Sequence, residues 1–308
     1  MTRSELLAEL SAALGARHEA RFILAEVLGP SPESSAPSVS PRAVAVARAT
    51  AARRRSGAPL QYLLGHWAFR TLDLLVDPRV LIPRPETEQV VEVVLAEIAH
   101  LGTAAPLIVD AGTGSGAIAL SLATELAAGP AAGPATGPAT GPASEPDTEL
   151  RGGGIWGIDA STTALAVARL NVARVARDQA QMLPVTLVHG HWLRALPPSL
   201  RGAVSLVVAN PPYVSAAEWG DLAEDVRREP EEALVADGGS DGTPGLAGLE
   251  TLLHEAPAWL SRPGAVVMEL APHQSTAAAG MARSLGYVEV RVEPDLAGRP
   301  RALVGRVR

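Results

Sequence analysis

The chain has 308 residues, of which 47% are hydrophobic and 3% aromatic, with a net charge of −7 and neither cysteine nor lysine. Cysteine chemistry, disulfides, lysine Schiff bases and the P-loop lysine are therefore excluded. The negative charge argues against binding nucleic acid along a broad surface, which needs a basic face. No stretch of about 20 apolar residues lacks charges or breakers, and the N-terminus is no signal peptide, so we expect a cytoplasmic protein without a membrane span.

Residues 1–58 are predicted to form a small helical domain. Leu6 and Leu10 belong to an apolar pattern with helical spacing, and a turn-rich segment, GPSPESSAPSVSP, precedes a further helix expected from Arg42 to Arg55. Three consecutive arginines, Arg53–Arg55, end this helix. We interpret them first as a solvated helix end and second as a binding patch.

Residues 59–84 are predicted to be an extended or hairpin linker, and residues 85–308 alternate apolar runs with helical stretches. Such alternation predicts a mostly parallel sheet wrapped by helices. The last two runs are joined too closely for a parallel crossover, so the final strand should be antiparallel. The predicted fold class is α/β, a Rossmann-like seven-stranded sheet typical of class I methyltransferases. The expected strands are Leu107–Ala111, Ile155–Asp159, Val185–His189, Val204–Ala209, Ala265–Leu270, Val288–Val292 and Ala302–Val307.

A low-complexity segment, GPAAGPATGPATGPASEPDT, occupies residues 129–148 between the first helix and the second strand of this alternation. Sequence rich in Pro, Gly and Ala cannot bury enough surface to offset the entropy of ordering it. We therefore expect a disordered Gly/Pro/Ala insert at the sheet edge opposite a ligand crevice, and expect it to be dispensable for function.

A glycine-rich loop follows the first strand of the sheet and precedes a helix. Glycines allow a tight turn and close approach of a ligand to the main chain. The spacing also fits a dinucleotide fingerprint, and a ligand-free turn is a third interpretation. The candidate cofactor residues of this loop are Gly112, Thr113, Gly114, Ser115 and Gly116.

Asp159 ends the second strand in the sequence GIDAS. A carboxylate at this point can accept hydrogen bonds from both hydroxyls of a ribose, in nicotinamide and S-adenosylmethionine enzymes alike. The alternative is a helix N-cap, although Ser161 is the better candidate for that role.

The fourth strand ends in Asn210, Pro211, Pro212 and Tyr213, which are the candidate catalytic residues. Consecutive prolines fix φ and lack N–H groups, so their carbonyls can point into a site with little freedom. The Asn210 carboxamide, also assigned to the cofactor site, and the Pro211 carbonyl can both accept from one NH2 group. An ordinary strand-ending turn is the plainer interpretation.

This acceptor pair suits an amide or exocyclic amine, whose nitrogen is poorly nucleophilic because its lone pair is delocalised. Two acceptors raise the electron density on nitrogen and aim it at an activated methyl group, so the protein supplies orientation and electrostatics rather than a general base. The ring of Tyr213 offers a face for a planar group. A nicotinamide enzyme has no use for such a pair.

These motifs together resemble the release factor glutamine methyltransferases over nearly the whole chain. The matching segments are PLQY at 59–62, LIPRPETE at 81–88, DAGTGSGAIAL, GIDAS, ANPPYV, Glu229-Pro230 with Asp241-Gly242, and DLAGR at 295–299. The resemblance implies transfer of a methyl group from S-adenosyl-L-methionine, leaving S-adenosyl-L-homocysteine, to the glutamine side-chain nitrogen of the Gly-Gly-Gln motif in peptide chain release factors.

The resemblance also implies roles for individual residues. Trp192 should flank the adenine, Arg84 and Glu86 should order a cover over the cofactor, and residues 1–58 should bind the release factor. Rigid initiation of a helix is the alternative for the PRPETE segment. The chain departs from the family at His191, where an Asp is usual, and at Ala271, where Glu269–Gln274 lacks the usual glycine.

Two other functions stay open at this point: an amino-methyltransferase acting on a nucleic-acid base, in DNA or ribosomal RNA, and a non-catalytic binding module. The first needs base extrusion and a basic, aromatic recognition region. His189 and His191 lie two residues apart, but no third ligand at a matching spacing suggests a metal site. We expect a monomer that binds no metal and contacts no nucleic acid directly.

Overall fold

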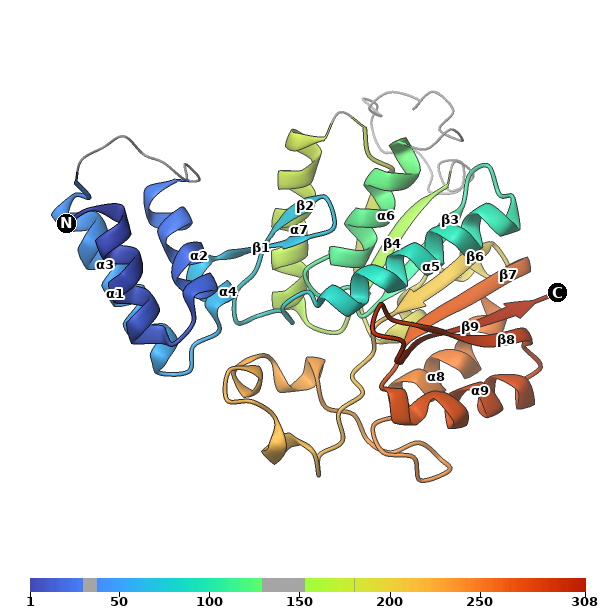
Figure 1. Ribbon diagram of the computed structural model, residues 1–308. Coiled ribbons are helices and arrows are strands. Elements are labelled where there is room, and N and C mark those ends of the chain that lie inside the picture. Colours follow the sequence, from blue (N-terminus) through green and yellow to red (C-terminus); the bar gives the residue numbers. More distant parts are fainter. Residues whose placement is uncertain (30–37, 129–152, 180) are drawn as a thin grey trace.

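The computed structural model describes residues 1–29, 38–128, 153–179 and 181–308 (Figure 1). N-terminal helices, a linking hairpin and a large α/β part follow one another along the chain. The predicted insert at 129–148 lies outside the described residues. Within those four ranges, no helix is long and apolar enough to cross a membrane.

The N-terminal part is a group of three helices with a core of its own. Thr2 begins the first helix with a capping box, because its side chain accepts from Glu5 N while the Glu5 carboxylate accepts from Thr2 N. Leu6, Ile23 and Ala47, one from each helix, are fully buried together. The helices are α1 (Arg3–Leu14), α2 (Arg17–Leu28) and α3 (Pro41–Arg55).

The link between the two parts combines a short helix with a hairpin. Residues 60–64, which we expected to be extended, instead form α4 (Leu60–Leu64), because Leu60 is buried in the core of the N-terminal helices. Gly65, with φ 81°, ends that helix in the left-handed conformation. The expected hairpin follows as the antiparallel pair β1 (His66–Phe69) and β2 (Leu72–Leu75).

The α/β part contains a seven-stranded sheet in the order β5-β4-β3-β6-β7-β9-β8. The first five strands of this order are parallel, and β9 is antiparallel to both of its neighbours, so the expectation for the final strand is confirmed. The strands are β3 (Leu107–Ala111), β4 (Gly154–Asp159), β5 (Val185–His189), β6 (Val204–Ala209), β7 (Leu260–Glu269), β8 (Val288–Pro294) and β9 (Pro300–Val307).

Helices cover both faces of this sheet, so the predicted α/β class is confirmed (Figure 1). Side chains of successive residues point to opposite faces: Ile108 packs with the helices on one side, and Val109 with those on the other. Burial of each such side chain stabilises the fold by roughly 1.5–3 kcal/mol. The first face carries α5 (Pro85–Leu101), α6 (Ala117–Ala128) and α7 (Thr162–Asp178), and the second carries α8 (Ala247–Glu255) and α9 (Ser275–Ser284).

The strand order reverses between β3 and β6. From β3 the chain moves outward to β4 and β5, and then returns to place β6 on the other side of β3. The two strands are parallel and in register, with Ala111 opposite Ala209. Ligands of open α/β sheets bind at such a switch point, beyond the carboxyl ends of the strands. The glycine-rich loop and the NPPY segment leave the sheet at this point.

Candidate active site

The glycine-rich loop is anchored to the end of β4. The amides of Gly112 and Thr113 both donate to the Ile158 carbonyl, at 2.8 and 2.9 Å. Gly112 and Gly114 have φ of 83° and 55°, a region that favours glycine. Apart from Gly114 and its two chain neighbours, no described residue has an atom within 4 Å of a Cβ built on Gly114. The loop therefore leaves open space beside its main chain.

Thr113 and Ser115, which flank Gly114, are both buried. Thr113 Oγ1 donates to Asp110 Oδ2 at 2.7 Å, and both of these residues are buried. The Ser115 carbonyl accepts from Asn171 Nδ2 at 2.9 Å. Burial raises the pKa of Asp110 to about 7. The Thr113 side chain and the Ser115 carbonyl thus stabilise the loop.

Asp159 ties the glycine-rich loop to the start of α7. Its Oδ2 accepts from Gly114 N and its Oδ1 from Ser161 N, both at 2.8 Å. Burial raises the pKa of Asp159, while these two backbone hydrogen bonds oppose the shift. The N-cap of α7 is Ser161, whose hydroxyl accepts from Ala164 N. Asp159 keeps further lone pairs that can accept hydrogen bonds from a ribose.

The NPPY segment lies directly beside the glycine-rich loop. A Cβ built on Gly112 would be 4.0 Å from the Asn210 carbonyl oxygen and 3.6 Å from the ring of Trp192. A Cβ on Gly248, in the first turn of α8, would be 3.3 Å from Pro211 and 3.4 Å from the same ring. The structure thus brings the predicted cofactor loop and the predicted catalytic segment together, and the Trp192 ring lies close to both.

Tyr213 is held by its main chain as well as by burial. Its carbonyl accepts from Gln274 Nε2 at 3.2 Å, and the same nitrogen donates to the Pro244 carbonyl at 2.8 Å. Burial raises the pKa of the Tyr213 hydroxyl to about 12, so the phenol is neutral at physiological pH. The neutral ring can therefore serve as a packing surface and a hydrogen-bonding group.

The PRPETE segment begins α5 beside this site. Arg84 is the N-cap residue, Pro85 is the first helical residue, and the Arg84 guanidinium pairs with Glu229. Glu229 also accepts from Ile82 N at 2.9 Å, and Glu86 pairs with Arg299 at 3.2 Å. The rigid helix start is therefore observed. Its charged residues tie the segment to the loop that follows NPPY and to the β8–β9 turn.

Two buried residues of this region received no role from the sequence. Thr87 Oγ1 donates to Glu269 Oε2 at 2.7 Å, and Asn210 Nδ2 donates to Thr87 Oγ1 at 3.4 Å. Thr87 lies in the PRPETE segment and Glu269 ends β7. In the sequence, Glu269 lies in the expected strand Ala265–Leu270 and begins the Glu269–Gln274 segment, but nothing local indicated its neighbours.

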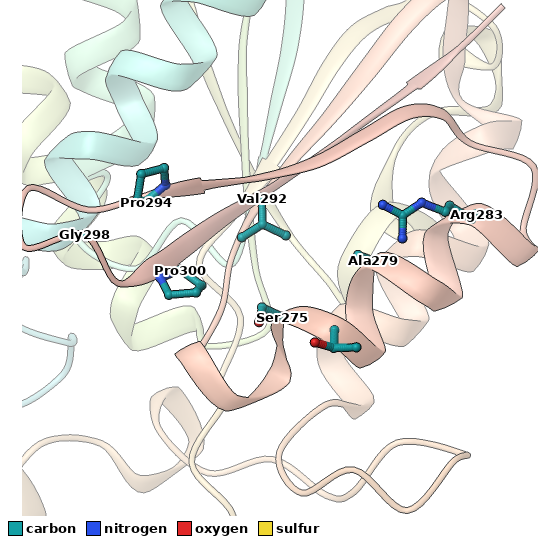
Figure 2. A pocket seen from close by; sticks show the side chains of 8 residues that line it. Ser275, Ala279, Arg283, Val292, Pro294, Gly298 and Pro300 are labelled. Atoms are coloured by element: carbon teal, nitrogen blue, oxygen red, sulfur yellow. The ribbon is translucent and has the colours of Figure 1, made fainter.

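Within the described ranges, no group of three or more His, Asp or Glu residues could hold a metal ion. His189 Nε2 instead bonds to the Ala160 carbonyl at 3.0 Å, and His191 packs edge-on against Trp192. A surface cavity of about 460 Å³ lies between α9 and the last two strands (Figure 2). It contains none of the predicted site residues; its lining includes Ser275, Ala279, Arg283, Val292 and Pro300.

Several curated proteins similar to this chain share one name. The chain is 35% identical over 293 residues to a release factor glutamine methyltransferase of Burkholderia pseudomallei, covering 94% of this chain and 91% of that one. It is 40% identical over 254 residues to a protein of the same name from Moorella thermoacetica, covering 82% and 76% of the two chains. A comparison with models of protein families found no match.

Among solved structures, the hMettl16 catalytic domain bound to an RNA hairpin matches with a TM-score of 0.50 at 13% identity, covering 86% of this chain and 81% of that one. Likeness at this identity shows a shared fold and nothing about substrate. The curated relatives share a third or more of their residues with this chain over most of both lengths, which confirms the resemblance read from the motifs. The chain therefore belongs to the release factor glutamine methyltransferase family.

Proposed function

We propose that this chain transfers a methyl group from S-adenosyl-L-methionine to the side-chain amide nitrogen of the glutamine in the Gly-Gly-Gln motif of peptide chain release factors. The observation that carries the proposal is the position of the NPPY segment at the switch point of the sheet, where the Asn210 carbonyl approaches Gly112 of the glycine-rich loop. Family membership supports the same substrate over a nucleic-acid base.

The cofactor is S-adenosyl-L-methionine, which supplies an electrophilic methyl group when bound. The residues present fit such a molecule. Gly114 leaves room along the loop, Asp159 has lone pairs for ribose hydroxyls, and the ring of Trp192 can flank the adenine. His191 is exposed and brings no carboxylate to that position, so recognition of the adenine amine relies on other groups.

The chain's own residues orient the substrate. We assign the Asn210 side-chain oxygen and the Pro211 carbonyl as acceptors for the two hydrogens of the glutamine NH2 group. Pro212 keeps the turn rigid, since its φ is restricted and it has no N–H to satisfy. The ring of Tyr213 packs against the planar amide. The nitrogen loses its proton easily once methylated, so no general base is assigned.

The division of labour along the chain is part of the proposal. Residues 1–58 form the domain that binds the release factor, residues 59–84 link it to the catalytic part, and residues 85–308 carry the chemistry. Arg54 supports coupling between the N-terminal domain and the catalytic part. Its guanidinium binds Glu19 of the first at 2.8 Å and Asp225 of the second at 3.1 Å. We further propose a monomer, acting in the cytoplasm where translation occurs and making no direct contact with nucleic acid.

The test is mass spectrometry of a purified release factor after incubation with the chain and S-adenosyl-L-methionine. We expect one added methyl group, on the Gly-Gly-Gln glutamine. Two controls should stay unmodified: a release factor whose glutamine is replaced by glutamate, and a reaction with Asn210→Ala, which should still bind the cofactor. Methylation of DNA or ribosomal RNA fragments instead of the release factor would overturn the proposal.

A further inference from the structure

The side chain of Asn210 has two ends of nearly equal shape. Its oxygen can accept a hydrogen bond from the substrate NH2 group, whereas its own NH2 group can only donate and would repel that substrate. Rotation by half a turn about the last bond exchanges the two ends. Methyl transfer therefore requires a neighbouring group that decides which end faces the substrate.

Thr87 is that neighbour. Its hydroxyl oxygen lies 3.4 Å from Asn210 Nδ2 and 2.7 Å from Glu269 Oε2. A hydroxyl has a single proton, and the short contact with the Glu269 carboxylate uses it. Thr87 can then only accept from Asn210, so the NH2 end must face Thr87 and the oxygen end must face away. The 3.4 Å contact is long, as hydrogen bonds of active sites without substrate often are.

Glu269 is held where it can perform this role. It ends β7, the strand beside β6, and its side chain is buried. Its other oxygen, Oε1, has no hydrogen-bond partner among the described residues, but Arg301 Nη1 lies 3.7 Å away. Arg301 is itself buried, and its Nη2 lies 3.6 Å from Asp295. Burial raises the pKa of Glu269 to about 7, and the nearby guanidinium opposes that shift, so the ionised, accepting form prevails above this pH.

The segment after β7 also holds the other end of NPPY. The Gln274 side-chain oxygen accepts from Ala271 N at 3.1 Å, which turns its NH2 group toward the carbonyls of Tyr213 and Pro244. Glu269 thus reaches Asn210 through Thr87, and Gln274, in the segment after β7, contacts Tyr213 directly. The main chain at Tyr213 is held independently of the Asn210 amide.

We propose that Thr87 and Glu269 are positioning residues, which fix the Asn210 side chain with its oxygen toward the substrate amide. The inference rests on the proposed function and assigns a role to two residues that do not touch the reacting atoms. The directed chain of donors runs from Asn210 Nδ2 to Thr87 Oγ1 and from Thr87 Oγ1 to Glu269 Oε2.

The experiment compares Thr87→Val with Thr87→Ser. Valine keeps the shape of threonine but lacks the hydroxyl, whereas serine keeps the hydroxyl but lacks the methyl. We expect Thr87→Val to lower kcat for release-factor methylation roughly tenfold to hundredfold, with the Kd for S-adenosyl-L-methionine changed by less than about twofold. Thr87→Ser should retain most of the wild-type kcat.

A packing role predicts the reverse order, with serine impaired and valine near wild type, and that result would overturn the inference. Equal loss in both variants would overturn it too. Circular dichroism and thermal melting establish that each variant is folded; if Thr87→Val is not, Thr87→Ala replaces it in the comparison. An inactive wild-type protein refutes the proposed function itself, whereas an active wild type with an unimpaired Thr87→Val refutes only the role of Thr87.

Discussion

Gly245 lies against the main chain of Tyr213. A Cβ built on Gly245 would come within 2.1 Å of the Tyr213 carbonyl oxygen, closer than any real contact, and the φ of Gly245 is 68°. The close approach lets Gln274 Nε2 reach both the Tyr213 and Pro244 carbonyls. The loop that follows NPPY therefore depends on the absence of a side chain at this position.

Gly245→Ala should displace Tyr213 and lower kcat, and we expect a loss of roughly hundredfold from a shift of about 1 Å at the motif. Gly242→Ala is the matched control. Gly242 lies in the same loop with φ 84°, but no described atom lies within 4 Å of its Cβ position. It carries similar backbone strain, about 1–2 kcal/mol, without the collision. Comparable kcat values for the two variants would contradict this account.

Asp159→Ala should weaken cofactor binding. The variant loses the acceptor for Gly114 N, which holds the glycine-rich loop, together with the proposed contacts to the ribose. Because lost hydrogen bonds to a charged group cost about 1.5–3 kcal/mol, the Kd for S-adenosyl-L-methionine should rise roughly tenfold or more, as measured by calorimetry. Ser161→Ala is the control: it removes the N-cap of α7 and should lower stability by about 1 kcal/mol while leaving this Kd unchanged.

The rate of methyl transfer should fall as the pH drops below about 7. Burial raises the pKa of Glu269 to about 7; Thr87, Arg301 and Arg84 oppose that shift, and Glu86 adds to it. Protonated Glu269 no longer requires the proton of Thr87, so Asn210 loses its fixed orientation. Single-turnover rates of methyl transfer, measured across this pH range, should fall below about pH 7 in the wild type and in Thr87→Ser but not in Glu269→Gln. If the rate of Glu269→Gln falls in the same way, the pH dependence belongs to another group.

Asp110 should make the fold less stable as the pH rises. Its pKa is raised from 3.8 to about 7 by burial, so the folded state binds more protons than the unfolded state between these values. Its contribution to stability is complete below the lower value and is lost as the pH rises through the higher one. We expect the free energy of unfolding of the wild type to decline relative to that of Asp110→Asn across this window, by at most about 1.4 kcal/mol per pH unit. Urea denaturation of both proteins at several pH values measures the difference. A difference that does not change with pH would refute the raised pKa of Asp110.

Some features of this protein are determined by the sequence alone, because they depend on local pattern. Alternating apolar runs and helical stretches predicted the strands of the sheet, and the short final connection predicted an antiparallel last strand. The sequence placed the glycine-rich loop, Asp159 and NPPY at the ends of three strands, and the carboxyl ends of parallel strands share one edge. The five residues of α4 escaped prediction because their conformation follows from burial of Leu60 against the N-terminal helices.

Only the tertiary structure decided which groups surround the Asn210 side chain. Thr87 comes from the first turn of α5, 123 positions before Asn210, and Glu269 lies 182 positions after Thr87. Their contact depends on the pairing of β6 with β7 and on the packing of α5 across that face. Periodicity and short motifs report which face a residue takes within its own element. The neighbours of a buried polar group are set by long-range packing, which has no local signature.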